Sequence, residues 1–165
     1  MSYAMEDQAA EAMPPMMAEG TALGPAIGTS REFRIARSGA RPLRFSGSEL
    51  AMAMSYTPEL PYWYEINIYR TAEKDFAVAI RLFHQSEDTK DTVEAWQCPS
   101  LEHALDLIES YDAAQDVMVG SAMETIGQPA AELAATAAHL KAKIAAARQH
   151  YQGLVGEIMA ELDVA

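Results

Sequence analysis

The residue types that carry acid–base, nucleophilic or metal chemistry are few in this chain and widely spaced. It has four histidines and one cysteine, and the zinc-ligand spacings HxxxH, HExxH and CxxC do not occur in the sequence. His139 and His150 share one face of a predicted helix, but they are about 16 Å apart along its axis at 1.5 Å per residue. One metal ion does not bridge that distance. The sequence therefore predicts no metal site.

Cys98 has the position that most resembles that of a catalytic nucleophile. It lies just before a predicted helix, whose dipole lowers a thiol pKa, and His103 follows about one turn into that helix. One cysteine near one histidine is a weak pattern, and a structural cysteine at the end of a strand accounts for it better. Gly20, Gly24 and Gly28 do not open a helix after a strand, so they form no phosphate loop. We therefore expect no catalytic residue and no cofactor.

The aromatic residues are concentrated in LPYWYEINIYR, residues 60–70. Side chains alternate between the two faces of a strand, so Trp63 and Glu65 lie on the face opposite to the aliphatic one. The next predicted strand, FAVAIRLF, alternates in the same way. A register in which paired residue numbers sum to 146 places Trp63 opposite Phe83 and Glu65 opposite Arg81, which are favourable pairs.

A further strand, TVEAWQ, is predicted for residues 92–97. A register sum of 175 with the preceding strand places Ala95 on the aliphatic face and Glu94 beside Arg81 on the other face. The pattern then predicts a row Glu65–Arg81–Glu94, which we interpret as an ion network because an arginine keeps both acids ionised. The candidate partner-binding residues of this second face are Trp63, Tyr69, Arg81, Phe83 and Trp96.

The elements that carry these residues predict an α+β fold, with a small antiparallel β-meander of about four strands and a covering helix in a domain of residues 31–112. Apolar alternation in PLRFSGSELAMAM changes phase across Gly47, which predicts a bulge or a tight bend there. The covering helix is predicted over residues 100–111 with Ser100 as N-cap. Residues 116–127 favour a further short helix.

The C-terminal region, residues 113–165, is dominated by a long alanine-rich helix that is predicted over 129–162. Its apolar residues recur at steps of four and three, which is a heptad pattern. At about 50 Å this helix is longer than the small sheet is wide, so part of the stripe packs either on another chain or within a helical bundle. The residues that we assign to association through this helix are Leu133, Leu140, Ile144, Tyr151, Leu154 and Ile158.

Composition and charge narrow the range of possible partners. Residues 1–30 are rich in Ala, Met, Pro and Gly without a period, which predicts a flexible or extended, disordered N-terminal tail. The net charge of −12 disfavours nucleic acid and anionic membrane as the main partner. Five arginines in residues 31–44 either neutralise acids within the chain or contact phosphates. The sequence has no long apolar run and no basic signal region, so we expect a cytoplasmic protein.

Three functions remain as hypotheses. The first is a non-enzymatic interaction or assembly protein that associates, with itself or with another protein, through its C-terminal helix and its aromatic sheet face. The alternative is a sheet domain that binds single-stranded nucleic acid by stacking, although no RNP-type motif is present. The third is an acidic antagonist of a basic protein surface, which the net charge suggests.

Overall fold

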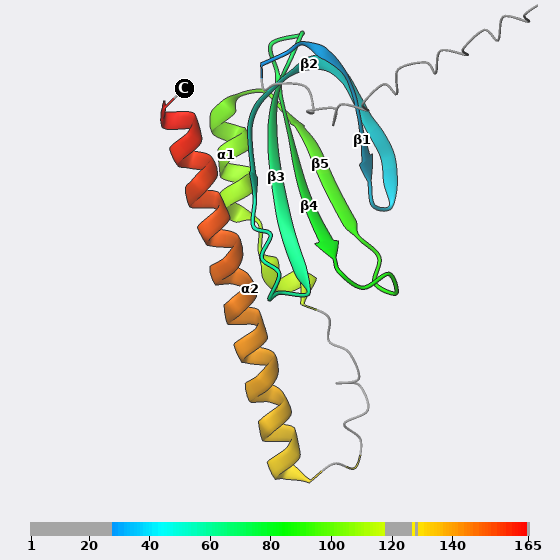
Figure 1. The fold of residues 1–165 in the computed structure, drawn as a ribbon, viewed down its shortest axis with the longest axis vertical. Helices are drawn as coiled ribbons and strands as arrows, with labels where there is room; N and C mark the ends of the chain where they lie inside the picture. Colours follow the sequence, from blue (N-terminus) through cyan, green and yellow to red (C-terminus); the bar gives the residue numbers. More distant parts are fainter. Residues whose placement is uncertain (1–27, 118–126, 128, 165) are drawn as a thin grey trace, which may run out of the picture.

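The chain forms a five-stranded antiparallel sheet followed by helices. The structure is a computed structural model that describes residues 28–117, 127 and 129–164. Its strands are β1 (Arg31–Arg37), β2 (Ala40–Met54), β3 (Tyr62–Thr71), β4 (Phe76–His84) and β5 (Thr92–Cys98). The helices are α1 (Leu101–Ser110), the 3-10 helix η1 (Ala113–Asp116) and α2 (Ala130–Val164) (Figure 1). The strands pair in chain order, which confirms the predicted meander with five strands in place of about four.

Glycine and proline residues lie in the turns that connect β1, β2 and β3. Gly39 has a φ of +71°, a left-handed conformation that glycine adopts without strain, and it closes the tight turn between β1 and β2. Pro58 and Pro61 lie in the loop between β2 and β3, where a missing backbone N–H is tolerated. The strands themselves are rich in β-branched and aromatic residues, which pack well on a pleated surface.

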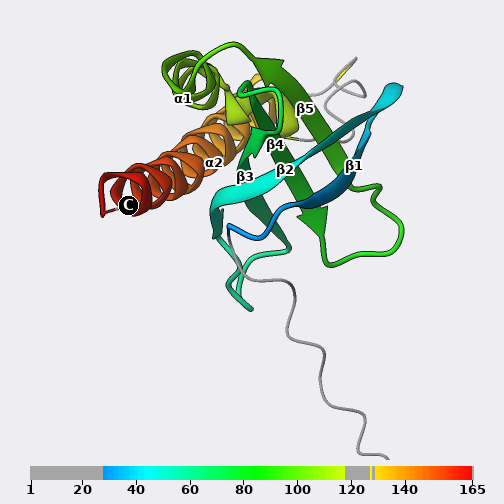
Figure 2. The ribbon, with the colours of Figure 1, turned by 90° about the horizontal axis from the view of Figure 1, so that it is seen from above.

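The sheet curls into a half-barrel. The Ser38 amide donates to the Val93 carbonyl at 2.8 Å, so the end of β1 reaches β5 although three strands lie between them. Viewed from above, β1 and the adjoining part of β2 lie across β3–β5 on the side away from the helices, whereas the last part of β2 contacts α2 (Figure 2). We call the inside of this curl the concave face, and the outside, on which the helices pack, the helix-covered face.

Two features of β2 accompany the curl. A Cβ on Gly47 would lie 2.1 Å from the Arg70 carbonyl oxygen, so only glycine fits where β2 approaches β3 this closely. The pairing with β3 then shifts between Glu49 and Ala51, which marks a bulge at Leu50. The predicted phase change is therefore present, but the extra residue lies three positions after the glycine.

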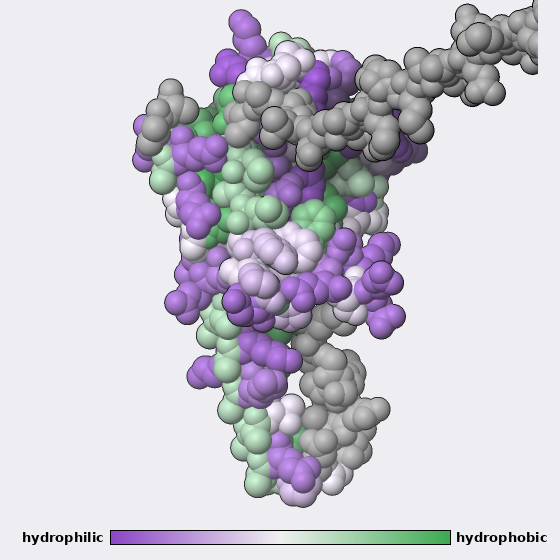
Figure 3. All heavy atoms as spheres, viewed as in Figure 1, coloured by the Kyte–Doolittle hydropathy of each residue, from purple (hydrophilic) through white to green (hydrophobic). Residues whose placement is uncertain are grey.

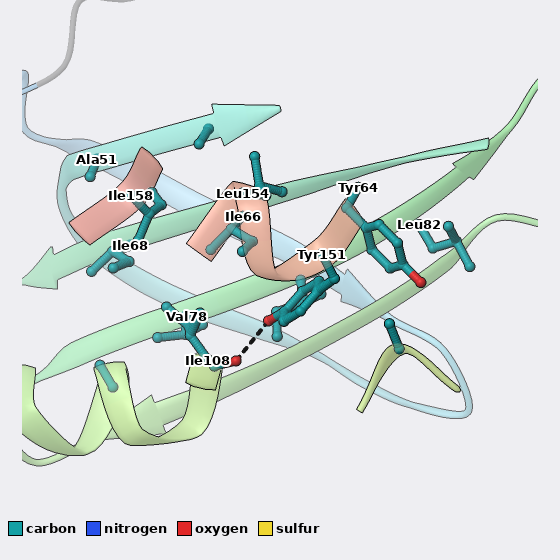
Figure 4. Packing of buried hydrophobic residues seen from close by; sticks show 14 of the residues in the cluster. Ala51, Tyr64, Ile66, Ile68, Val78, Leu82, Ile108, Tyr151, Leu154 and Ile158 are labelled. Carbon is teal, nitrogen blue, oxygen red and sulfur yellow. Dashed lines mark hydrogen bonds between the residues drawn. The ribbon is translucent and has the colours of Figure 1, made fainter. Parts of the chain in front are cut away.

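The main core lies between the helix-covered face and the two helices. Tyr64, Ile66 and Ile68 of β3 are fully buried there. Figure 4 shows Tyr151 of α2 between Tyr64 and α1, where its hydroxyl donates to the Ile108 carbonyl at 2.9 Å. This contact joins α2, α1 and the sheet, and it satisfies a polar group that is buried with the tyrosine.

A second core fills one end of the concave face. Phe33 of β1 stands over Tyr69 of β3 with ring centroids 4.7 Å apart, and Phe45 stacks on Phe33 at 5.2 Å. Tyr69 is only 3% exposed as a result. The other buried residues of this second core are Ile35, Ala77, Ala79 and Ala95.

The predicted pairing of β3 with β4 is confirmed, since Trp63 pairs with Phe83 and Glu65 with Arg81. The predicted pairing of β4 with β5 is wrong, because Ile80 pairs with Glu94, which gives a sum of 174. A slip of one residue moves every side chain of a strand to the opposite face.

The register of β5 differs from the predicted one because both faces of β5 are buried. Ala95 belongs to the second core, inside the curl, whereas Trp96 and Cys98 pack with the main core. Alternation cannot choose between two faces that are both apolar. Glu94 therefore lies on the helix-covered face, and the predicted row of Glu65, Arg81 and Glu94 does not form.

The helix that covers the sheet begins as predicted. The Ser100 hydroxyl accepts a hydrogen bond from the His103 amide at 3.1 Å, which confirms Ser100 as the N-cap of α1. Beyond α1, η1 ends at Asp116, and most of the short helix predicted for 116–127 lies outside the described residues. The predicted N-terminal tail, residues 1–30, also lies outside them except for residues 28–30.

The long helix α2 has 35 residues and divides into two parts. In its C-terminal half, Tyr151, Leu154 and Ile158 are at most 2% exposed and belong to the main core. Its first turns extend beyond the end of the sheet, and we call residues 130–142 the projecting end (Figure 1). Arg148, which follows it, donates two hydrogen bonds to Asp112 and lowers the pKa of that carboxyl to about 2. None of the described helices combines the length and the apolarity that a membrane span requires.

Candidate functional site

The sheet residues that the sequence assigned to partner binding do not form one surface. Trp63, Arg81 and Phe83 lie together on the concave face, through the pairing of β3 with β4. Tyr69 shares that face but is buried in the second core. Trp96 packs against the main core from the helix-covered face, so it is separated from the other four by the sheet.

An exposed apolar surface remains on the concave face, at the end away from the second core. Trp63 stacks on Phe83 with ring centroids 5.3 Å apart and an interplanar angle of 24°, and Tyr56 contacts Trp63 edge-on at 5.2 Å. Met52 and Met54 of β2 pair with Asn67 and Glu65, which places them on the same face. We call the set Met52, Met54, Tyr56, Trp63 and Phe83 the aromatic patch.

The methionines and Tyr56 are the part of this surface that sequence reasoning missed. Met52 is 40% exposed, Met54 48% and Tyr56 53%. The alternation of Met52 and Met54 was visible in the sequence. The face on which they lie depends on the bulge at Leu50, and their exposure depends on where β1 begins, at Arg31. β1 pairs with β2 only as far as Gly47, so the methionines farther along β2 lie beyond that pairing and are exposed.

A polar network lies beside the aromatic patch. The Arg81 guanidinium binds both the Glu65 carboxylate and the Asn67 side-chain carbonyl. The Asn67 amide in turn donates to Glu49 at 2.8 Å. Burial alone would lower the pKa of Arg81, but the Tyr69 hydroxyl and the Glu65 carboxylate outweigh it and the pKa is raised. Arg81 is therefore a permanent cation whose hydrogen bonds fix its position.

This network forms the floor of an open groove of about 470 Å³. Arg31 and Arg34 line the groove from β1, and the Arg31 guanidinium stacks over the Phe33 ring at 4.6 Å. Met52 of the aromatic patch lines the same groove. The concave face thus combines a satisfied charge network with exposed apolar side chains.

The predicted association stripe of α2 is divided by the fold. Leu133 is 38% exposed on the projecting end, and Leu140 and Ile144 are partly exposed. In the space-filling view this end of the molecule shows a pale hydrophobic strip beside hydrophilic side chains (Figure 3). Tyr151 and Leu154, nearer the C-terminus in the same stripe, pack inside the chain's own core.

A second cavity lies between the ends of β3 and β4, η1 and α2, and has a volume of about 450 Å³. Its polar feature is Asp116, whose Oδ2 accepts hydrogen bonds from the hydroxyls of Tyr64 and Tyr111, both at 2.8 Å. Burial raises the pKa of Asp116, although the two tyrosine hydroxyls oppose that shift. We call this cavity the tyrosine–aspartate pocket. Its residues are far apart along the chain, so no local pattern predicted it.

Cys98 is 1% exposed, and burial raises the pKa of its thiol. That environment opposes formation of a nucleophilic thiolate, even though α1 begins three residues later. Among the described residues, no three His, Cys, Asp or Glu side chains gather closely enough to hold a metal ion.

No protein-family model, no curated protein and no solved structure matches this chain.

Proposed function

We propose that this chain is a non-enzymatic interaction protein that binds another protein through the aromatic patch. One observation carries the proposal. Four large hydrophobic side chains are strongly exposed among the described residues, and three of them, Met52, Met54 and Tyr56, belong to this patch. Contiguous exposed apolar surface on a folded domain is typical of a binding site.

The composition of the patch favours a protein partner. Aromatic residues and arginines supply most of the binding energy at protein interfaces, and Trp63 and Arg81 are diagonal neighbours across the pairing of β3 with β4. Methionine side chains adapt to irregular partner surfaces, which suits Met52 and Met54. The fixed Arg81–Glu65 pair beside the patch supplies charges that orient a partner without a large ordering cost.

The stacking of bases on this face is less well supported. Trp96, one of the aromatics on which that alternative depended, lies on the helix-covered face. Trp63 already stacks on Phe83, and the chain carries a net charge of −12, which repels phosphate.

The projecting end of α2 belongs to the same proposal as a second contact. Leu133 and Leu140 continue the apolar stripe past the sheet, and Lys141 and Lys143 flank it. In a parallel pair of such helices the lysines of one copy would approach those of the other, which is unfavourable, whereas an acidic surface would pair with them. We therefore expect the contact surface on the partner of this end to be acidic.

Site-specific cross-linking tests the proposal. The full chain carries a photoreactive amino acid at position 56 in one sample and at the exposed position 102 of α1 in the control. We expect one partner protein to cross-link at position 56 and not at position 102. The purified partner should then bind Tyr56→Ala at least tenfold more weakly than Glu102→Ala.

Two results would contradict the proposal. One is equal cross-linking from both positions, and the other is unchanged affinity of the Tyr56→Ala variant. A saturable quenching of tryptophan fluorescence by single-stranded oligonucleotide at physiological salt would instead support the stacking alternative.

A further inference from the structure

We propose that the tyrosine–aspartate pocket binds a primary ammonium group carried on a short apolar chain, of the kind that a lysine side chain or a free alkylamine presents. The pocket lies on the helix-covered side of the sheet, through Tyr64 and Leu82, whereas the aromatic patch lies on the concave face. The inference is therefore independent of the proposed function.

The first argument is the carboxylate. Asp116 lines the pocket, and its Oδ2 accepts from two tyrosine hydroxyls. Among the described residues, none donates to its Oδ1, and none forms an ion pair with it within 4.0 Å. A partly buried carboxylate that lacks a cation is unfavourable, so a cationic ligand gains more here than at a fully exposed acid.

The second argument is a buried acceptor in the same pocket. His84 lines it, and its Nδ1 is buried without a hydrogen-bond partner among the described residues. Its nearest acid, Asp91, is 3.8 Å away, which is beyond a hydrogen bond. In the neutral ring with the proton on Nε2, Nδ1 accepts a hydrogen bond. A primary ammonium has three N–H donors and can donate to more than one acceptor of this lining, which a quaternary ammonium cannot.

The remaining wall fits the rest of such a ligand. It is mostly apolar, with Leu60, Pro61 and Leu82 on the sheet side and Val117 and Ala147 on the helical side. The rings of Tyr62 and Tyr64 also line it, and aromatic faces attract cations. A volume of about 450 Å³ is within the usual size of a small-molecule site.

Lys143 restricts the charge of the ligand. It is exposed and lines the same pocket from α2. Its charge disfavours a ligand with a second positive group, so a monoamine is a better occupant than a diamine. Replacement of this lysine should leave the binding of a monoamine intact or strengthen it.

The test uses the full chain and three probes of similar bulk: n-butylammonium, tetramethylammonium and n-butanol. Calorimetric titration should show saturable binding of n-butylammonium at least tenfold tighter than that of the other two. Tetramethylammonium has the charge without N–H donors, and butanol has the chain without the charge. Equal binding of all three, or no saturable binding of the amine, would overturn the proposal.

Variants locate the binding. Asp116→Asn should weaken n-butylammonium at least tenfold, and Ala146→Phe should block it by filling the pocket from an exposed position of α2. Glu157→Gln removes an exposed acid on α2 that does not line this pocket, and should bind like the wild type. Undiminished binding by Asp116→Asn and Ala146→Phe, or loss of binding on Lys143→Gln, would show that this assignment of the site is wrong.

Discussion

Leu133 and Leu154 occupy equivalent positions of the heptad stripe, three repeats apart, but the fold uses them differently. Leu154 is 2% exposed and packs in the main core, whereas Leu133 is 38% exposed on the projecting end. Replacement of each by alanine therefore separates the core part of α2 from the part that extends beyond the sheet.

The expected losses in the free energy of unfolding differ several-fold between the two variants. Leu154→Ala removes about three buried carbons, worth about 2.4 kcal/mol of transfer free energy, and leaves a cavity, so the free energy of unfolding should fall by about 3 kcal/mol. Leu133→Ala removes partly solvated atoms and introduces a better helix former, so its effect should stay within about 0.5 kcal/mol.

Urea unfolding, followed by tryptophan fluorescence and by circular dichroism, measures both values. With a slope of about 2 kcal/mol per molar urea, the midpoint should fall by about 1.5 M for Leu154→Ala and by less than about 0.3 M for Leu133→Ala. Equal losses for the two variants in dilute, monomeric protein would refute this division of the helix. A loss for Leu133→Ala that appears only at high protein concentration would reveal a contact between two copies at the projecting end.

Three further perturbations test other parts of the structure. Gly47→Ala would place a Cβ 2.1 Å from a β3 carbonyl oxygen and should destabilise the fold by about 1–3 kcal/mol in urea unfolding. The control Gly153→Ala, whose Cβ would have nothing within 4 Å, should be neutral or stabilising. A larger loss of stability for Gly153→Ala than for Gly47→Ala would contradict the close approach of β2 to β3. Tyr151→Phe removes the hydroxyl that donates to the Ile108 carbonyl and should lower stability by about 1–2 kcal/mol, while an unchanged melting temperature would show that the hydrogen bond contributes nothing. Burial raises the folded-state pKa of Asp116 above its ordinary value of 3.8, so its favourable contribution is present below that value and is lost as pH rises through the folded pKa. Asp116→Asn should therefore gain stability relative to the wild type as pH rises above about 4, and a pH-independent difference between the two proteins would contradict the shift.

Sequence reasoning succeeded where one local rule had one consequence. Alternation with favourable opposite pairs sufficed for the register of Trp63 with Phe83, because β3 and β4 are joined by a short turn and each has one clearly aliphatic face. The N-cap of α1 at Ser100 likewise depends on a single side chain and the amide of His103.

It failed where the outcome depended on a distant segment. The face of Trp96 could not be read from β5, because the curl of β1 creates a second apolar core that makes both sides of that strand suitable for burial. The same curl buries Tyr69 and leaves Met52 exposed, so the candidate surface is a different set of residues from the one that alternation predicted.

The sequence by itself determined the order of the elements, the existence of the aliphatic sheet face and the length of α2, since these follow from periodicity and local propensity. Only the tertiary structure decided which half of the α2 stripe is core, and only it brought Tyr64, His84 and Asp116 to one pocket. The physical reason is that burial is a property of pairs of surfaces. A residue pattern specifies which face is apolar, but the partner that covers that face is set by the path of the whole chain.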